Sequence, residues 1–140
     1  MGITNRQIKY FNIAREMSRL SNFHRQHLGC VVVYKKKHVL SVGVNQAKSH
    51  ILQAVYNQYR GFDIHGYPAS LHAEIDALSK IRHLNIDWSK VELYVYRENR
   101  NDGTLAMAYP CRACMRFIVE LGIREIYYTT DNGYGFERII

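Results

Sequence analysis

The chain has 140 residues and a formal net charge of +7, with 47% hydrophobic residues, 22% charged residues, nine glycines and two prolines. This composition excludes a disordered tail, and the length favours a single folded domain over residues 1–140. Because the sequence contains neither an apolar run of about 18 residues nor the apolar core of a signal peptide, we expect a soluble, cytoplasmic protein that does not bind membranes.

The three cysteines and the positive charge bear on the class of partner. In a reducing compartment, cysteines are free thiols or metal ligands more often than disulfides. A basic chain favours anionic partners such as nucleotides or nucleic acids, although a basic surface more often serves solubility.

The first half of the chain predicts a helix followed by a β-hairpin. Thr4 and Gln7 form a capping box at the start of a helix within the first 20 residues, with apolar residues on one face. The β-branched run Gly29–Tyr34 predicts a strand buried on both faces, and a tight turn leads to a second strand over residues 38–45. Residues 46–70 are expected to form a long loop with one helical stretch around residues 50–59.

The second half alternates helices and strands. Ser70 is the expected N-cap of a helix over residues 70–81, and strands follow at residues 91–96 and 124–130. Between these strands, a helix is expected to open at Pro110 and to end at Gly122. The turn at residues 131–133 predicts a hairpin into a short fifth strand over residues 134–140.

These elements predict an α/β fold with helices on the faces of one sheet. The sheet should be mixed and five-stranded, with parallel neighbours through the middle, since each strand–helix–strand step is a crossover connection. The last two strands should be antiparallel because only a tight turn joins them.

His72, Cys111 and Cys114 are the candidate metal ligands. A catalytic zinc site uses three protein ligands and keeps a fourth position for water. Cys111 and Cys114 lie three residues apart in one helical turn, so both sulfurs can face one point, where the backbone N–H groups favour the thiolate. His72, from another helix, would complete the set. The sequence therefore predicts Zn²⁺ as a cofactor.

Glu74 is the candidate catalytic residue. It lies too close to His72 in the chain to ligate comfortably beside it, but it is near enough to reach a water on the metal. A carboxylate in that place is suited to move protons.

The order His72, Glu74, Pro110, Cys111, Cys114 resembles the H-x-E…P-C-x-x-C signature of zinc nucleobase deaminases. The segment "HAE" resembles the form that this motif takes in the cytidine deaminase superfamily. Residues 28–50 are similar to the family's first hairpin, and residues 117–130 to its stretch after the cysteines. The chain looks like a compact standalone cytidine/deoxycytidylate-type deaminase, which implies a three-layer α-β-α cytidine-deaminase-like fold.

The resemblance also implies a reaction and a set of contacts. Water activated by zinc would attack C4 of a cytosine, and ammonia would leave to give the uracil form. Asn45 would bind the sugar or base, and the Ala73 backbone N–H would contact the polar edge of the base. Tyr109 and Pro110 are further candidates for substrate binding. Because family members commonly assemble, a homo-oligomer is expected.

Two departures leave the substrate open. Only ten residues follow Thr130, so no helix fits between the last two strands, although polynucleotide-editing and deoxycytidylate members generally have one. The hairpin ending is typical of free-cytidine deaminases, yet these usually have cysteine in place of His72.

The first hypothesis is a free cytosine nucleoside or nucleotide as substrate. The second is cytosine or adenine within single-stranded DNA or RNA, with the rings of residues 56–67 stacking on bases and Arg60 meeting phosphate. Those rings could also pack beneath a lid or at a subunit contact.

Other interpretations give these residues no catalytic role. The third hypothesis is a structural zinc module, closed by a fourth ligand such as His50 or His65. Cys111 and Cys114 could instead be small buried residues, as is expected of Cys30. Asn45 could be a turn former. Two more alternatives are an exposed Glu74 opposite Lys80 or Arg82, and a second metal site built from His24, His27, His50 and His65.

Overall fold

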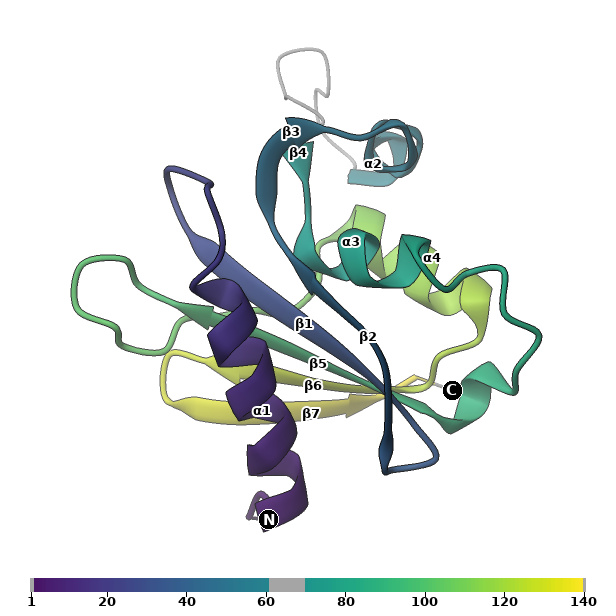
Figure 1. The fold of residues 1–140 in the computed structure, drawn as a ribbon, viewed down its shortest axis with the longest axis horizontal. Coiled ribbons are helices and arrows are strands. Elements are labelled where there is room, and N and C mark those ends of the chain that lie inside the picture. Colours follow the sequence, from purple (N-terminus) through teal and green to yellow (C-terminus); the bar gives the residue numbers. More distant parts are fainter. Residues whose placement is uncertain (1, 61–69, 140) are drawn as a thin grey trace.

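The computed structural model describes residues 2–60 and 70–139, which form a five-stranded sheet with helices on both faces (Figure 1). In spatial order the strands are β2 (His38–Val44), β1 (His27–Tyr34), β5 (Val91–Glu98), β6 (Glu125–Thr130) and β7 (Gly133–Arg138). β5 and β6 are parallel, and the other neighbouring pairs are antiparallel. The mixed sheet and its antiparallel last pair are thus confirmed. The prediction of parallel neighbours holds only for β5 and β6, because β1 lies between β2 and β5.

Helix α1 (Asn5–Ser18) covers one face of the sheet, where Figure 1 shows it lying across the strands. The capping box of Thr4 and Gln7 is present, so the predicted start of this helix is confirmed. Tyr10 and Phe11 pack there on Val31 and Val33 of β1. No described helix combines the length and apolarity needed to cross a membrane.

The other face carries the helices that bear the predicted site. Cys30 and Val32 of β1 point to this side, so side chains alternate between two cores along a strand that is buried on both faces. Helices α3 (Ala73–Ser79) and α4 (Arg112–Leu121) pack here, and α4 ends at Gly122 in the left-handed conformation at φ 100°. The result is the predicted three-layer arrangement. A short 3-10 turn, η2 (Trp88–Lys90), precedes β5.

Helix α3 lies directly against β2. A Cβ atom on Gly43 would stand 2.4 Å from the carbonyl oxygen of Ala73 and 2.5 Å from the nitrogen of Ala77, so only glycine permits this approach. The buried Asp76 carboxylate accepts the backbone N–H of Val44 at 3.0 Å. These contacts fix the first turn of α3 over the end of β2.

The structure corrects the start of this helix. Ser70 does not cap it but belongs to β4 (Ser70–Leu71), which pairs with β3 (Gln46–Ser49). The helix begins at Ala73, with His72 at the N-cap. Local sequence favoured a serine cap, whereas the pairing with β3 depends on residues more than 20 positions away.

Residues 46–60 are more regular than a loop. Besides β3 they form α2 (Ile51–Asn57) and the 3-10 turn η1 (Gln58–Arg60), which confirms the predicted helical stretch. Residues 61–69 lie outside the described part of the chain. The predicted aromatic stretch over residues 56–67 can therefore be followed only as far as Arg60.

β7 forms one edge of the sheet and exposes Tyr134 and Phe136. Exposed aromatic side chains on an edge strand are compatible with assembly of several copies. The expected homo-oligomer stays a prediction.

Candidate active site

His72, Cys111 and Cys114 come together, with their ligand atoms within 4.8 Å of one another. His72 Nδ1 lies 3.6 Å from Cys111 Sγ and 3.4 Å from Cys114 Sγ. Tetrahedral zinc with bonds of about 2.3 Å to sulfur and about 2.0 Å to nitrogen holds such atoms about 3.5 Å apart. The donor types and their spacing therefore fit a zinc ion. Within residues 2–60 and 70–139, this is the one His/Cys/Asp/Glu cluster with that spacing.

Two of the three donors occupy N-cap positions without capping their helices. His72 precedes α3 and Cys111 precedes α4, and neither side chain forms the capping hydrogen bond of an N-cap residue. Both side chains turn toward each other instead. The predicted opening of the second helix at Pro110 is thus wrong by two residues, because Cys111 holds the N-cap and α4 begins at Arg112.

The cluster favours one thiolate. The hydrogen bond from Cys114, helped by the one from His72, lowers the pKa of Cys111 to about 3 in spite of burial. The same bond to Cys111, together with burial, raises the pKa of the Cys114 thiol. Burial lowers the pKa of His72, but the Cys111 sulfur outweighs burial, so the pKa of His72 is raised. A divalent metal ion bound by these three side chains would replace the protons that they share, because metal ligands are deprotonated.

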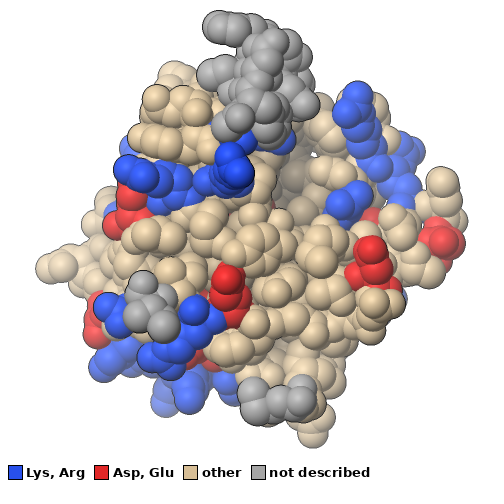
Figure 2. All heavy atoms as spheres, turned by 180° about the vertical axis from the view of Figure 1, so that it is seen from behind, with Lys and Arg blue, Asp and Glu red and all other residues tan. Residues whose placement is uncertain are grey.

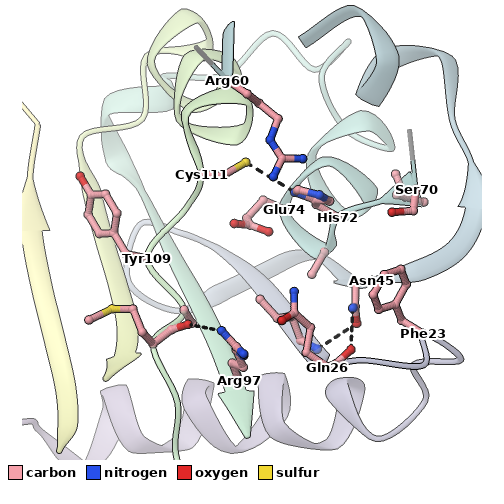
Figure 3. Close-up of a pocket in the computed structure, with 15 residues that line it drawn as sticks. Phe23, Gln26, Asn45, Arg60, Ser70, His72, Glu74, Arg97, Tyr109 and Cys111 are labelled. Carbon is pink, nitrogen blue, oxygen red and sulfur yellow. Dashed lines mark hydrogen bonds between the residues drawn. The ribbon is translucent and has the colours of Figure 1, made fainter. Parts of the chain in front are cut away.

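Glu74 lies in the same cavity, on the first turn of α3. Its side chain is only 3% exposed, and Figure 3 shows its carboxylate beside His72 and Cys111. Burial raises the pKa of Glu74 to about 7. The alternative of an exposed Glu74 opposite Lys80 or Arg82 is wrong, because Glu74 is buried; Lys80 Nζ pairs instead with Asp76 at 3.5 Å.

A cavity of about 190 Å³ opens beside these residues. Its wall is built from both ends of the β1–β2 hairpin, the start of α3, the end of β5 and the segment before α4. The lining residues are Phe23, Gln26, Leu28, Asn45, Arg60, Ser70, Leu71, His72, Ala73, Glu74, Arg97, Met107, Ala108, Tyr109 and Cys111.

Asn45 lines the cavity but also holds its wall together. Its Oδ1 accepts the backbone N–H of Leu28 at 2.9 Å, and its Nδ2 donates to the carbonyl of Gln26 at 2.8 Å. An amide has two donor hydrogens and two acceptor lone pairs, so capacity for a ligand is left. The interpretation as a simple turn former does not account for these contacts.

Of the other predicted substrate contacts, Ala73 and Tyr109 line the cavity and Pro110 does not. Ala73 is the first residue of α3, where a backbone N–H has no acceptor within the helix. Tyr109 lines the cavity, but its hydroxyl donates to Glu137, and this bond raises the pKa of Tyr109 to about 12. Pro110 is buried and is not among the described residues that line the cavity.

The remaining histidines do not form a second metal cluster in the described part of the chain. His50 caps α2, with Nδ1 accepting the N–H of Leu52 at 3.1 Å. The ring of His27 bonds the carbonyl of Phe23. His65 lies outside the described residues. His50 is therefore not a fourth ligand, and Cys30 is fully buried in the core, as expected.

Two residues of the site were not predicted from the sequence. The fully buried Gln53 of α2 accepts the backbone N–H of His72 at 3.0 Å. Arg97 of β5 lines the cavity. Arg97 could have been found, since it follows Leu93 and Val95 on one face of a strand where another apolar residue is expected.

Comparison with known proteins agrees with the site. The family model of the cytidine and deoxycytidylate deaminase zinc-binding region matches residues 4–130. No curated protein sequence matches the chain. The dCMP deaminase of cyanophage S-TIM5 in its apo form is 27% identical, with a TM-score of 0.58 over 86% of this chain and 79% of that chain.

Two further solved structures share the fold. In complex with dCMP and dUMP, the cyanophage S-TIM5 dCMP deaminase aligns at 24% identity and a TM-score of 0.60, over 91% of this chain and 83% of that chain. The cytidine deaminase of Burkholderia pseudomallei aligns at 16% identity and a TM-score of 0.66, over 97% of this chain and 93% of that chain. With its donor cluster and a family match over residues 4–130, the chain belongs to the family of the cytidine and deoxycytidylate deaminase zinc-binding region.

Proposed function

We propose that the protein is a hydrolytic deaminase that converts a cytosine nucleoside or nucleotide to its uracil form and releases ammonia. The observation that carries the proposal is the presence of the three donors and the buried Glu74 carboxylate in one cavity. A zinc ion held by His72, Cys111 and Cys114 would lower the pKa of a coordinated water to about 7.

Glu74 would move the protons of the reaction. Its carboxylate accepts a proton from the attacking water and delivers it to the ring nitrogen next to C4. A second proton then passes through Glu74 to the amino group. The C4–N bond breaks, the water oxygen becomes the C4 carbonyl oxygen, and ammonia leaves. The position of Glu74 in a nearly closed site keeps bulk water from these transfers.

The base would be oriented by groups at the start of α3. The N–H of Ala73 has no helical acceptor and can donate to the base carbonyl. Asn45 can contact the sugar while it keeps residues 26–28 in place. Tyr109 would contribute its ring rather than its hydroxyl, because the hydroxyl is engaged by Glu137.

A cytosine within a nucleic acid strand is the second candidate substrate, and the net charge of +7 supports it. On the face seen in Figure 2, however, Lys and Arg side chains stand in separate groups with acidic side chains between them. A strand that tracks along a protein is usually bound by a continuous basic groove. This pattern favours the small substrate. Steep loss of single-strand binding between low and moderate salt would favour the strand instead.

The structural zinc module has less support. A structural zinc site is normally closed by four protein ligands. The described residues offer three, and a cavity borders them.

The test is an assay of the zinc-loaded protein with cytidine, deoxycytidine and their monophosphates, with ammonia and uracil products measured. We expect turnover of at least one compound. Glu74→Gln should lower kcat by about 100- to 10,000-fold and leave zinc content and Tm unchanged. Glu120→Gln is the matched control, since Glu120 is a surface carboxylate of α4 paired with Arg116. No turnover of any compound, or full activity of Glu74→Gln, would contradict the proposal.

A further inference from the structure

Arg97 lies near the end of the central strand β5, beyond the part of the strand that packs in the hydrophobic core. Leu93 and Val95 point from β5 into the core beneath α3 and α4, and both are fully buried. Arg97 is the next residue on that face. Opposite Leu28 of β1, its side chain enters the cavity instead of the core. A cationic side chain therefore lines the cavity at a strand position where the alternation along β5 predicts an apolar residue.

The guanidinium of Arg97 uses little of its hydrogen-bonding capacity. Nη1 donates to the carbonyl of Met107 at 3.2 Å. Nε is buried and has no hydrogen-bond partner among the described residues. A guanidinium carries five N–H donors, so the two Nη atoms keep donor capacity beyond the bond to Met107.

The charge of Arg97 is also not engaged in an ion pair with a carboxylate of the described residues. No ion pair within 4.0 Å involves Arg97 in residues 2–60 and 70–139. The next residue, Glu98, belongs to the other face of the strand and pairs with Arg19 at 3.5 Å. Charge pairing in a partly buried place is stronger than in open water, so this position favours a ligand with negative charge.

The position of Arg97 in the cavity indicates which part of a substrate it meets. Figure 3 shows Arg97 at the end of the cavity away from Cys111 and His72, with Glu74 between them. A base that reacts beside Glu74 would direct its sugar, and whatever the sugar carries, away from the metal ligands. Phosphate is the anion that a cytosine nucleotide carries on its sugar, and guanidinium groups bind phosphate through paired hydrogen bonds.

We infer that Arg97 binds the phosphate of a cytosine nucleotide and makes the nucleoside monophosphate, rather than the nucleoside, the preferred substrate. This inference rests on the proposed deaminase function. Arg60 also lines the cavity, but Figure 3 places it beside Cys111, at the end where the reaction would occur. Arg97 is therefore the better placed of the two cations for a group on the sugar.

The test compares deoxycytidine with deoxycytidine monophosphate as substrates of the zinc-loaded wild type and of Arg97→Gln. Glutamine keeps a polar side chain at this position but has no charge. We expect the wild type to have the higher kcat/KM for the monophosphate. In Arg97→Gln, the ratio of the two kcat/KM values should fall about 10- to 100-fold, mainly through KM for the monophosphate. Arg97→Lys should recover part of the ratio. Arg138→Gln, a surface substitution on β7 with the same loss of charge, should keep it.

Other outcomes would overturn the assignment. A structural role for Arg97 would lower kcat/KM for both compounds alike and leave the ratio unchanged. A wild type that prefers the nucleoside would also contradict it, as would a single-stranded oligonucleotide turned over at least about tenfold better than the monophosphate.

If no compound is deaminated, the proposed function fails, and binding still tests Arg97 separately. In calorimetric titrations, deoxyuridine monophosphate should bind the wild type more tightly than deoxyuridine, and Arg97→Gln should remove this difference. Equal binding of both compounds to the wild type would overturn the inference about Arg97.

Discussion

The side-chain oxygen of Gln53 accepts the backbone N–H of His72 at 3.0 Å, and this bond joins α2 to the first metal donor. Gln53 is fully buried, and its Nε2 donates to Asn57 at 2.9 Å within the same helix. Both polar ends of the Gln53 side chain are thus engaged. The short helix α2 therefore helps to position His72 at the start of α3.

Gln53→Leu should weaken zinc binding about 10- to 100-fold, because partners that orient a ligand contribute to metal affinity on this scale. The substitution leaves the backbone N–H of His72 without its acceptor. Competition with a chromophoric chelator measures the affinity. Gln58→Leu, one turn later on an exposed position, is the control. Equal zinc affinity of Gln53→Leu and wild type would contradict this role.

The two cysteines of the cluster should be required for zinc, and the third should not. Cys111→Ser and Cys114→Ser are expected to lose stoichiometric zinc, whereas Cys30→Ala keeps it because Cys30 lies in the core. Metal analysis of the purified variants decides the matter. Loss of zinc from Cys30→Ala with full occupancy in Cys114→Ser would show that the donor set is wrong.

Removal of the metal should lower the stability of the folded state. A ligand at 100 times its Kd that binds only the folded chain adds about 2.7 kcal/mol to the free energy of unfolding. We therefore expect a chelator to lower Tm and abolish deamination, and added zinc to restore both. An unchanged Tm across the titration would contradict a zinc site built from α3 and α4.

Glu92 is a buried carboxylate on the side of the sheet away from the site. It is 2% exposed and accepts from Arg6 Nη1 at 2.6 Å and Nη2 at 3.1 Å, and from the Tyr94 hydroxyl at 3.1 Å. Arg6→Met should cost about 2 kcal/mol of unfolding free energy, less than the roughly 3–5 kcal/mol of a fully buried broken pair, because Arg6 is partly exposed. Urea denaturation measures the change.

The double variant Arg6→Met/Glu92→Gln is the control for this pair. It removes the charge that the single variant leaves without a partner, so part of the lost stability should return. If the stability losses of the single variants Arg6→Met and Glu92→Gln simply add in the double variant, Arg6 and Glu92 do not interact energetically.

Gly43→Ala should damage both stability and activity. Its Cβ would lie 2.4 Å from the Ala73 carbonyl oxygen, so α3 must move away from β2, and His72 and Glu74 move with it. Overpacking of this kind costs about 1–3 kcal/mol. Gly2→Ala is the control, since nothing lies within 4 Å of a Cβ there. A wild-type Tm and kcat in Gly43→Ala would contradict the tight contact.

Several elements could be predicted because their signals are local. The capping box of Thr4 and Gln7 needs residues three apart, and the helix end at Gly122 needs one residue at positive φ. The β-branched run in β1 indicated burial on both faces. The start of α3 was predicted wrongly because the pairing of Ser70 with Ser49 competes with local capping. That pairing depends on residues that are far from Ser70 in the sequence.

The sequence by itself indicated which residues can hold a zinc ion and which carboxylate lies near them. The identities and spacing of His72, Glu74, Cys111 and Cys114 identify a three-donor zinc set with a carboxylate, since few side chains offer those ligand atoms. Only the tertiary structure decided what surrounds that set. Gln53 reaches His72 across 19 residues, and Arg97 enters the cavity because β5 extends beyond the core covered by α3 and α4. Spacing along the chain does not determine such contacts, because they depend on how helices and strands pack in three dimensions.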